Sequence, residues 1–368
     1  MVEQERVTLL YGMASRGSAL VGLDIGTTSV KAARIRRQGD RVTVTSIARS
    51  AIESAVAPGA PADDKIVMAV WRCLRVLGGR AGVVCSLAGP DVAVRTFEFP
   101  ALPRHQLASA VELEAAQVCP FEVSEGAVSY HVLGGPPAKG AKPPADAQRL
   151  RGFFAAARNK IIQHRKGLCE RGDATCVVMD VDGLALLNCL EACKKHKTRE
   201  AAMVLNVGYA YTNVAIISDD GLPFVRDISY AGGHILTRIS QIIELPRPAV
   251  AAALEGGAET EIPRSRLQPA VRQACTGLAD RVAETLRYHG TRKSGPPVDR
   301  VYLCGGFTQS GAVAKALISL LPAKTELWDP LAVLPCTRAV RKSPVVEFGP
   351  AFAVAVGLAM RTLRDVHD

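Results

Sequence analysis

The sequence predicts an α/β protein built from two similar lobes. Three observations lead to this fold class: a strand–turn–strand unit occurs twice with the same spacing, an apolar strand ends in a glycine pair before a helix, and the chain is long enough for two cores. Of its 368 residues, 48% are hydrophobic and 5% are aromatic. This composition is typical of a globular protein that buries a core in each of two domains.

The first copy of the repeated unit, residues 21–35, reads VGLDIGTTSVKAARI: an apolar strand, a glycine turn and a strand of alternating pattern. A glycine there lets a ligand approach the backbone, and successive N–H groups with threonine hydroxyls form a cradle for a phosphate. An aspartate beside the turn suits Mg²⁺, which keeps part of its water shell, and a lysine adds positive charge. The residues concerned are Asp24, Gly26, Thr27, Thr28 and Lys31.

The second copy, residues 203–230, reads MVLNVGYAYTNVAIISDDGLPFVRDISY and repeats the same order of elements. Its turn carries Thr212. The matched positions are Asp24, Gly26 and Gly39 in the first copy and Asn206, Gly208 and Gly221 in the second, fifteen residues from first to last in both. A single glycine turn is common, but two copies with equal spacing indicate two lobes that face each other across one nucleotide.

Two further glycine pairs stand where a helix begins. Residues 298–322, VDRVYLCGGFTQSGAVAKALISLLP, form an apolar strand, the pair Gly305 and Gly306, and a helix. Residues 231–239, AGGHILTRI, place Gly232 and Gly233 at the start of another helix. Bare backbone at such a position lets a flat or anionic group pack closely, although a plain strand-to-helix turn has the same pattern.

These stretches together resemble a known superfamily. GLDIGTTSVK resembles the first phosphate loop of the actin-like ATPases, LNVGYAYTNVAI resembles the second, and LCGGFTQSGAV resembles the adenosine motif. Within that superfamily the chain resembles the PilM family of type IV pilus assembly proteins, which is related to FtsA. The stretches at residues 112–134, 231–239 and 349–361 support PilM in particular. The resemblance covers nearly the whole chain from about residue 21, with the motifs in the expected order.

The resemblance implies that ATP or ADP binds with Mg²⁺, which Asp24 would hold through water. The implied nucleotide-binding residues are Asp24, Gly26, Thr27, Thr28, Lys31, Asn206, Gly208, Thr212, Gly232, Gly233, Gly305, Gly306 and Phe307.

This sequence departs from the family pattern at two of those positions. Asn206 stands where the second phosphate loop usually has aspartate, and an amide brings no negative charge to a metal ion or an attacking water. Phe307 replaces a third glycine, where a phenyl ring either stacks on the adenine edge or narrows the pocket. Asp182, with Asp180 close by, is the candidate to orient the attacking water, or else a helix cap. We expect bound nucleotide with slow or absent hydrolysis.

The resemblance also implies a division of the chain. The first actin-like lobe takes residues 18–200 together with 349–368, and an inserted subdomain lies at about 91–173. The second lobe takes residues 201–348 and contains a helical insert at about 232–295.

The expected partner is the N-terminal cytoplasmic segment of a PilN-like membrane protein, bound in a groove beside the inserted subdomain. Such a segment binds as an extended strand or a short helix, so the groove needs apolar walls and backbone edges. Its candidate residues, which are equally suited to a core, are Phe97, Phe99, Pro120 and Phe121. The resemblance further implies other platform proteins as partners, a capacity for self-association, and a cytoplasmic location at the inner-membrane face through partners.

Charge and cysteine content narrow the classes of function. The formal net charge of +10 suits an anionic partner, but the basic residues are dispersed and nucleic acid is not indicated. Ten cysteines without a CxxC pair indicate neither a disulfide framework nor a zinc ribbon. Cys189 and Cys193, with His196 beyond them, share a helix face by spacing, which suits a metal ion or plain helix packing.

Other classes of protein share parts of this pattern. A sugar or acetate kinase has both phosphate loops, but it needs a catalytic aspartate base between the hairpins that we do not find. An FtsA-like filament scaffold usually ends in an amphipathic membrane helix, whereas this sequence ends RTLRDVHD. No signal peptide is evident. We expect no apolar run as long as the about 18 to 20 residues that a membrane span needs. Residues 1–17 have no assigned role.

Overall fold

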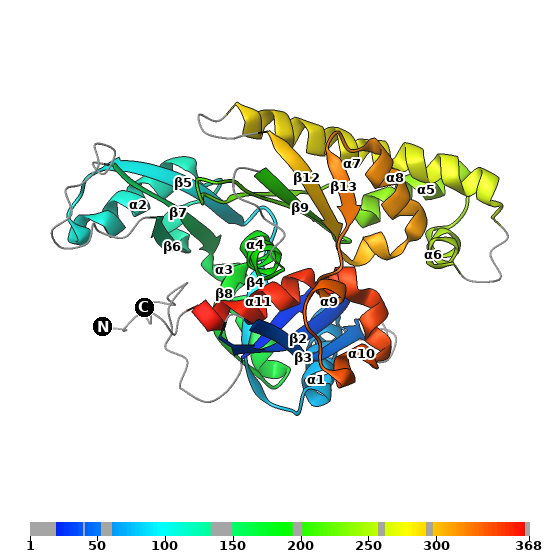
Figure 1. The fold of residues 1–368 in the computed structure, drawn as a ribbon, viewed down its shortest axis with the longest axis horizontal. Coiled ribbons are helices and arrows are strands. Elements are labelled where there is room, and N and C mark those ends of the chain that lie inside the picture. The colour runs from blue at the N-terminus through cyan, green and yellow to red at the C-terminus, as the bar shows by residue number, and fades with distance from the viewer. Residues whose placement is uncertain are drawn as a thin grey trace.

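The computed structural model describes residues 20–39, 41–52, 61–133, 149–193, 201–256, 262–291 and 297–364. Strands and helices are mixed throughout, as the α/β class predicts (Figure 1). Residues 1–17 and His196 lie outside the described residues.

The first repeat lies in a five-stranded sheet of order β3-β2-β1-β4-β8. Strands β1 (Val21–Ile25), β2 (Ser29–Gln38) and β3 (Arg41–Ala51) form an antiparallel meander. Strands β4 (Ala81–Leu87) and β8 (Ala174–Val181) continue the sheet in parallel with β1. The chain leaves β1 at its carboxyl end and turns back directly into β2.

The second repeat lies in a sheet of the same design, with order β11-β10-β9-β12-β13. Strands β9 (Ala201–Val207), β10 (Thr212–Ile217) and β11 (Phe224–Ile228) form the antiparallel meander. Strands β12 (Val298–Cys304) and β13 (Lys324–Leu327) run parallel to β9. The equal spacing in the sequence therefore corresponds to two meanders with equivalent strand order.

The glycines that close the two repeats have the same backbone conformation. Gly39 follows β2 with φ of 58°, and Gly221 follows β10 with φ of 70°. A residue with a side chain rarely adopts this left-handed region, so glycine is favoured at both turns.

A smaller antiparallel sheet of order β5-β7-β6 lies to one side of the large sheets, with β5 next to β11 (Figure 1). It consists of β5 (Val92–Pro100), β6 (Gly126–Leu133) and β7 (Arg149–Arg158), and it packs on helix α2 (Arg104–Val118). The short 3₁₀ helix η1 (Val123–Glu125) precedes β6.

Helices cover the outer faces of the two large sheets. The first sheet carries α1 and α3, and the second carries α5, α6, α7 and α8. Their bounds are α1 Ala62–Val76, α3 Asn159–Arg171, α5 Gly232–Ile243, α6 Arg247–Glu255, α7 Arg264–Gly290 and α8 Gly311–Leu320. Shorter turns complete the fold: η3 Gly306–Gln309, α9 Pro330–Val333, α10 Arg338–Arg341 and η4 Pro344–Phe352.

Two helices, α4 (Asp182–Ala192) and α11 (Ala353–Arg364), form a shared layer between the large sheets (Figure 1). A single apolar cluster joins them to strands of both sheets, for example to Val84 of β4 and Val204 of β9. Glycine permits this packing, because a Cβ on Gly357 of α11 would lie 1.8 Å from the carbonyl oxygen of Ala185 in α4. The two lobes therefore share a core.

Among the residues that the structure describes, one window has the length and composition of a membrane span, although the sequence predicted no such run. Residues Pro344–Arg361 have a mean hydropathy of 1.3 over 18 residues. Most of the window, 67%, is buried inside the fold, where α11 packs on α4 and β1. Burial in the shared core therefore explains why this window is apolar.

Prediction for the shared layer. We expect Gly357→Ala to lower the free energy of unfolding by about 2 kcal/mol or more, because the added methyl group overlaps backbone of α4. The matched control is Gly167→Ala in α3, where a Cβ meets nothing within 4 Å, so helix propensity should raise stability by up to about 1 kcal/mol. Thermal melts of both variants test this prediction. Equal shifts of the two melting temperatures in the same direction would contradict the close packing of α11 on α4.

Candidate functional site

The strand alternation of both repeats points their polar residues into the space between the lobes. In β1, Val21, Leu23 and Ile25 belong to the outer core, so Asp24 faces the opposite way. In β9, Met203, Leu205 and Val207 pack outward, so Asn206 also faces inward. We call this set of strand ends, with the turns that follow them, the strand-end site.

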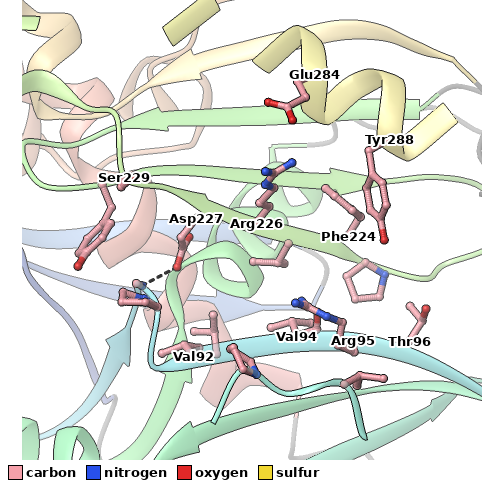
Figure 2. A pocket seen from close by; sticks show the side chains of 18 of the residues that line it. Val92, Val94, Arg95, Thr96, Phe224, Arg226, Asp227, Ser229, Glu284 and Tyr288 are labelled. Carbon is pink, nitrogen blue, oxygen red and sulfur yellow. Dashed lines mark hydrogen bonds between the residues drawn. The ribbon is translucent and has the colours of Figure 1, made fainter. Parts of the chain in front are cut away.

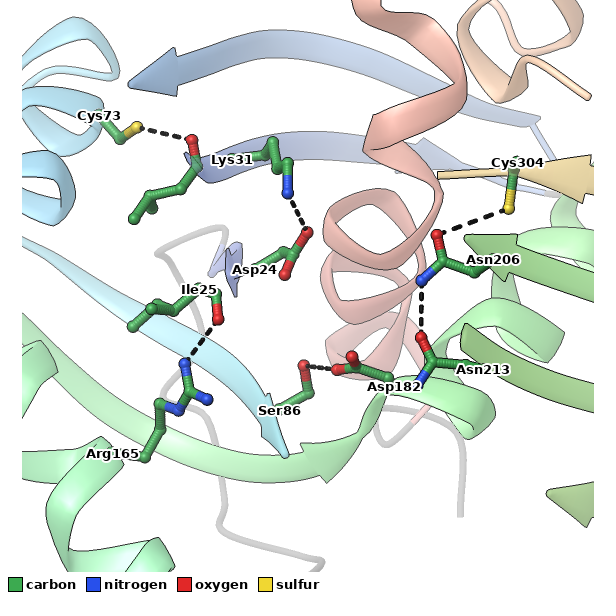
Figure 3. A network of polar contacts seen from close by, with 11 residues as sticks. Asp24, Ile25, Lys31, Cys73, Ser86, Arg165, Asp182, Asn206, Asn213 and Cys304 are labelled. Atoms are coloured by element: carbon green, nitrogen blue, oxygen red, sulfur yellow. Dashed lines mark hydrogen bonds and ion pairs between the residues drawn. The ribbon is translucent and has the colours of Figure 1, made fainter. Parts of the chain in front are cut away.

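Asp24 and Lys31 form the charged centre of the first turn. They are directly opposite each other in the β1–β2 register, and Lys31 Nζ lies 3.1 Å from Asp24 Oδ2 (Figure 3). Each residue is only 8% exposed. A buried pair of this kind holds a cation and a carboxylate at one fixed place beside the turn.

The turn between them is made of Gly26 and two exposed threonines, Thr27 and Thr28. The Gly26 N–H donates to the carbonyl of Ser29 at 3.2 Å, and a Cβ on Gly26 would lie 3.1 Å from Lys31 Nζ. A side chain here would therefore crowd the lysine, while the threonine side chains face outward from the strand ends.

The second turn engages several of its own polar groups. The Gly208 N–H donates to the carbonyl of Tyr211 at 3.0 Å, and the Thr212 hydroxyl donates to the carbonyl of Tyr230 at 3.0 Å. Thr212 is fully buried, which leaves no exposed hydroxyl for a ligand. Thr212 thus holds the turn in place.

Gly232 and Gly233 attach the start of α5 to that turn. Their N–H groups donate to the carbonyls of Gly208 and Tyr209, each at 2.9 Å. Both N–H groups therefore have partners inside the protein, and close backbone packing accounts for the glycine pair.

The third glycine pair lies against the end of β9. Gly305 has φ of 106°, and a Cβ there would lie 2.7 Å from Asn206 Oδ1, so only glycine fits. Gly306 is exposed and has open space beside it. The ring of Phe307 packs on Gly232, where an added Cβ would meet it at 2.4 Å. The phenyl ring therefore fills the gap between η3 and α5.

Asn206 is part of a chain of hydrogen bonds that crosses the second sheet. Its Nδ2 donates to Asn213 Oδ1 at 2.7 Å, and Asn213 Nδ2 donates to Asp227 Oδ1 at 2.7 Å. The Gly89 N–H, from the loop between β4 and β5, donates to Asp227 Oδ2 at 2.6 Å. Burial raises the pKa of Asp227, and the hydrogen bonds from Asn213 and Gly89 act in the opposite direction.

Asp182 is the first residue of α4 and faces the same space. Val181 occupies the N-cap position, and the Asp182 side chain accepts instead from the Ser86 hydroxyl at 2.5 Å. Burial raises the pKa of Asp182 to about 7, and the negative charge of Asp24 adds to the effect. Asp227 contributes in the same direction, so carboxylates from both lobes act on Asp182.

Asp180 has a structural partner. Its Oδ2 lies 3.0 Å from Nε of Arg361 in α11, and Asp180 is 3% exposed. This ion pair ties β8 to the shared helix layer.

The cysteines provide no metal cage. Cys189 and Cys193 are buried free thiols within the shared apolar cluster. Within the described ranges, no group of three or more His, Cys, Asp or Glu side chains is placed to hold a metal ion. Helix packing therefore accounts for the spacing of Cys189 and Cys193.

A cavity of about 920 Å³ lies between the small sheet and the second lobe, and we call it the β5–β11 cavity (Figure 2). One wall comes from β5 and α2, and the other from β11 and α7. Lining residues include Val92, Val94, Thr96, Pro120, Val225 and Tyr288. Strands β5 and β11 are each the outermost strand of their sheet, so backbone edges border the cavity.

The predicted groove residues divide between this cavity and a core. Pro120 lines the cavity. Phe97 and Phe121 are 3% and 7% exposed and belong to the cluster beneath the small sheet, and Phe99 stacks on Phe97 with ring centroids 4.8 Å apart. Phe97 and Phe121 are therefore core residues, not groove residues.

A comparison with models of known protein families shows which family the chain belongs to. The family model described as type IV pilus assembly protein PilM matches residues 22–363. The chain belongs to this family. The resemblance indicated by the sequence motifs is thus confirmed.

Solved structures support the same fold. The chain is similar to one in the PilM–PilN type IV pilus biogenesis complex, with a TM-score of 0.76 and 22% identity over 94% of this chain and 98% of that chain. It is also similar to the ethanolamine utilization protein EutJ from Carboxydothermus hydrogenoformans, with a TM-score of 0.51 and 14% identity over 93% and 89%. The predicted fold of two actin-like lobes is confirmed.

Three residues of this region were absent from the sequence prediction. Ser86 lies on β4, outside the motifs, whereas Asn213 and Asp227 lie within the second repeat but were not chosen as site residues. The alternation of β10 and β11 contains the relevant signal, because Asn213 faces both Asn206 and Asp227 in the strand register. That register depends on pairing between strands, which local pattern alone does not reveal.

Prediction for Asp182. The folded protein holds this proton up to about pH 7, whereas the unfolded chain releases it near its ordinary pKa of 3.8. The free energy of unfolding therefore falls as pH rises through this window. Asp182→Asn removes that dependence, so we expect its melting temperature relative to the parent to rise by a few degrees between pH 5 and pH 8. The control is Asp299→Asn, an exposed change on β12, whose melting temperature should differ from that of the parent by the same amount at every pH. If the melting temperature of Asp182→Asn also followed that of the parent in parallel across this pH range, the raised pKa of Asp182 would be contradicted.

Proposed function

We propose that this protein is a nucleotide-binding scaffold of a type IV pilus assembly platform, and that it holds the N-terminal segment of a PilN-like membrane protein. The observation that carries the proposal is the match of the PilM family model to residues 22–363. The strand-end site would take ATP or ADP, and the β5–β11 cavity would take the partner. Through such partners the protein would act at the cytoplasmic face of the inner membrane.

The residues of the first turn fit a nucleotide phosphate. Exposed Thr27 and Thr28 follow a bare glycine, and Lys31 places a cation beside them. Backbone N–H groups, hydroxyls and a cation are the groups that bind phosphate oxygens. On the opposite side Gly306 offers open, exposed backbone, whereas Phe307 fills the neighbouring gap. We therefore place the base beside Gly306, against the edge of the Phe307 ring.

The carboxylates fit a hydrated magnesium ion. The charge of Asp24 raises the pKa of Asp182, which means that the two groups repel each other when both are ionised. A divalent cation between them would relieve this repulsion. Because no cage of three ligands is present among the described residues, the ion would keep several waters and bind the nucleotide phosphates as well.

Slow or absent hydrolysis follows from the state of two side chains. The Asn206 amide brings no charge, and its NH₂ group is engaged by Asn213. Asp182 is the remaining group near Asp24 that can orient a water, and its carboxylate already accepts a hydrogen bond from the Ser86 hydroxyl. We propose that nucleotide acts mainly as a structural ligand that holds the two lobes in one arrangement.

The β5–β11 cavity suits an extended peptide. Two outermost strands border it, so a peptide backbone can pair with either edge, and apolar residues such as Val92 and Pro120 can receive alternate side chains. Arg95 and Arg226 also line it, together with Glu114 and Glu284. Charges of both signs would fix the direction of a peptide that carries charged residues.

We also propose the division of the chain given above. The first lobe would comprise residues 18–200 and 349–368 with its insert at about 91–173, and the second would comprise 201–348 with its helical insert at about 232–295. Other platform proteins and a second copy of this chain would bind at other surfaces.

Prediction for the nucleotide. We expect isothermal titration to show ATP binding that requires Mg²⁺. Asp24→Asn keeps the size of the side chain and removes its charge, so we expect about tenfold weaker binding or more. Asp299→Asn should bind as the parent does. Absence of ATP binding by the folded parent protein would contradict the proposed ligand.

Prediction for the partner. A synthetic peptide with the sequence of the PilN-like protein's cytoplasmic N-terminal segment should bind the parent protein. Tyr288→Ala removes a 59% exposed ring from the cavity wall and should weaken binding about tenfold. The control is Trp71→Ala, a 41% exposed ring on α1. Equal losses for the two variants, or none for Tyr288→Ala, would place the peptide elsewhere.

A further inference from the structure

A continuous polar chain joins the strand-end site to the β5–β11 cavity. Asn206, Asn213 and Asp227 are cross-strand neighbours on β9, β10 and β11, and all three side chains lie on the inner face of the sheet. The hydrogen bond from Asn206 to Asn213 measures 2.7 Å (Figure 3), and the bond from Asn213 to Asp227 also measures 2.7 Å. The bond from the Gly89 N–H to Asp227 measures 2.6 Å (Figure 2). We call these four residues the polar chain.

The two ends of the polar chain lie at different sites. At one end, Asn206 Oδ1 lies 3.9 Å from Cys304 Sγ and beside Gly305, two residues before the Gly208 turn. At the other end, Gly89 and Asp227 both line the β5–β11 cavity. The loop that carries Gly89 leads directly into β5, which forms one wall of that cavity.

The order of donors and acceptors in the polar chain has one consistent solution. The Asp227 carboxylate only accepts, and it receives one N–H from Gly89 and one from Asn213. Asn213 must therefore turn its amide oxygen toward Asn206, and Asn206 must present its NH₂ group in return. The Asn206 oxygen is then the atom left to face Gly305.

This order explains why an amide stands at position 206. An aspartate there would set two acceptors against each other, unless Asn213 turned over and lost its bond to Asp227. The negative charge that the superfamily pattern places on the second phosphate loop is here found at Asp227, two strands away. Asn213 is 2% exposed, and a buried amide of this kind is tolerated only when its partners are complete.

We propose that Asp227 is a positioning residue that couples the two sites. Through Asn213 it sets the orientation of the Asn206 amide, and through Gly89 it holds the loop that enters β5. A change at Asn206 would then be felt at Gly89, and the reverse, because binding linkage is reciprocal. What each site binds rests on the proposed function, whereas the coupling itself belongs to the polar chain.

The contact around Gly89 makes it a sensitive end point. Gly89 has φ of 103°, and a Cβ there would lie 3.0 Å from the ring of Tyr211, so the loop packs closely against the second lobe. Its N–H is buried and bonded to Asp227 alone among the hydrogen bonds of the described residues. Hydrogen exchange of this one amide therefore reports on the polar chain.

The test is a double-mutant cycle read at the Gly89 amide. Hydrogen exchange is measured by NMR on ¹⁵N-glycine-labelled full-length protein for the parent, Asn206→Asp, Asp227→Asn, and the double variant. Asn206→Asp sets two acceptors against each other, so we expect exchange at Gly89 to be about tenfold faster. In Asp227→Asn the three amides can all turn over and keep every bond, so we expect exchange to stay within about twofold of the parent. The double variant restores the order with the carboxylate at the other end, so we expect exchange to return to within about twofold of the parent.

Controls separate coupling from general loosening. Asn159→Asp and Asp299→Asn make the same chemical changes at exposed positions and should leave Gly89 unaffected. Additive effects in the cycle, or no effect of Asn206→Asp at Gly89, would overturn the proposal. If a single variant fails to fold by circular dichroism, a folded double variant supports the polar chain, and an unfolded one opposes it.

A second arm distinguishes this inference from the proposed function. MgATP is added to the parent and to the double variant, and heat of binding is recorded beside Gly89 exchange. Bound MgATP should shift Gly89 exchange in both proteins, and binding without any shift would overturn the coupling. Absence of binding would contradict the nucleotide proposal, while the mutant cycle would still decide on the polar chain.

Discussion

The packing of α4 and α11 between two equivalent sheets is the constraint on which the rest of the structure depends. Two repeats that each bury one sheet face against their own helices still leave an apolar inner face uncovered. The shared helices cover both inner faces at once, with Gly357 permitting direct backbone contact. Because this layer is apolar only along part of its length, the strand ends beyond it remain available for polar residues.

The candidate functional residues lie where the shared layer of α4 and α11 ends. Asp24 and Asn206 lie on inward positions of equivalent strands, just before the turns, and Asp182 begins the helix between them. Carboxylates and amides gathered in one partly buried place perturb one another, and the raised pKa of Asp182 is the clearest consequence. The β5–β11 cavity lies along the same boundary between the lobes, so a single hydrogen-bonded path suffices to connect the two sites.

The sequence predicted the features that depend on local pattern and repetition. The two strand–turn–strand hairpins, the glycine turns at Gly39 and Gly221 and the glycine pairs before helices could all be read from spacing. Features that depend on strand register and packing could not. Phe97 and Phe121 are residue types that suit either a core or a groove. Only the packing of α2 on the small sheet shows that they belong to a core. Asp227 has no local signal, because its importance comes from its partners on other strands.

The central claim is that the two turns of the strand-end site face one ligand. The most direct measurement is a crystal structure of the protein with Mg²⁺ and a non-hydrolysable ATP analogue. We predict phosphate density between the Gly26 and Gly208 turns, with the metal ion on the side of Asp24. An analogue bound elsewhere, or a structure without density between the turns at saturating ligand, would contradict the claim.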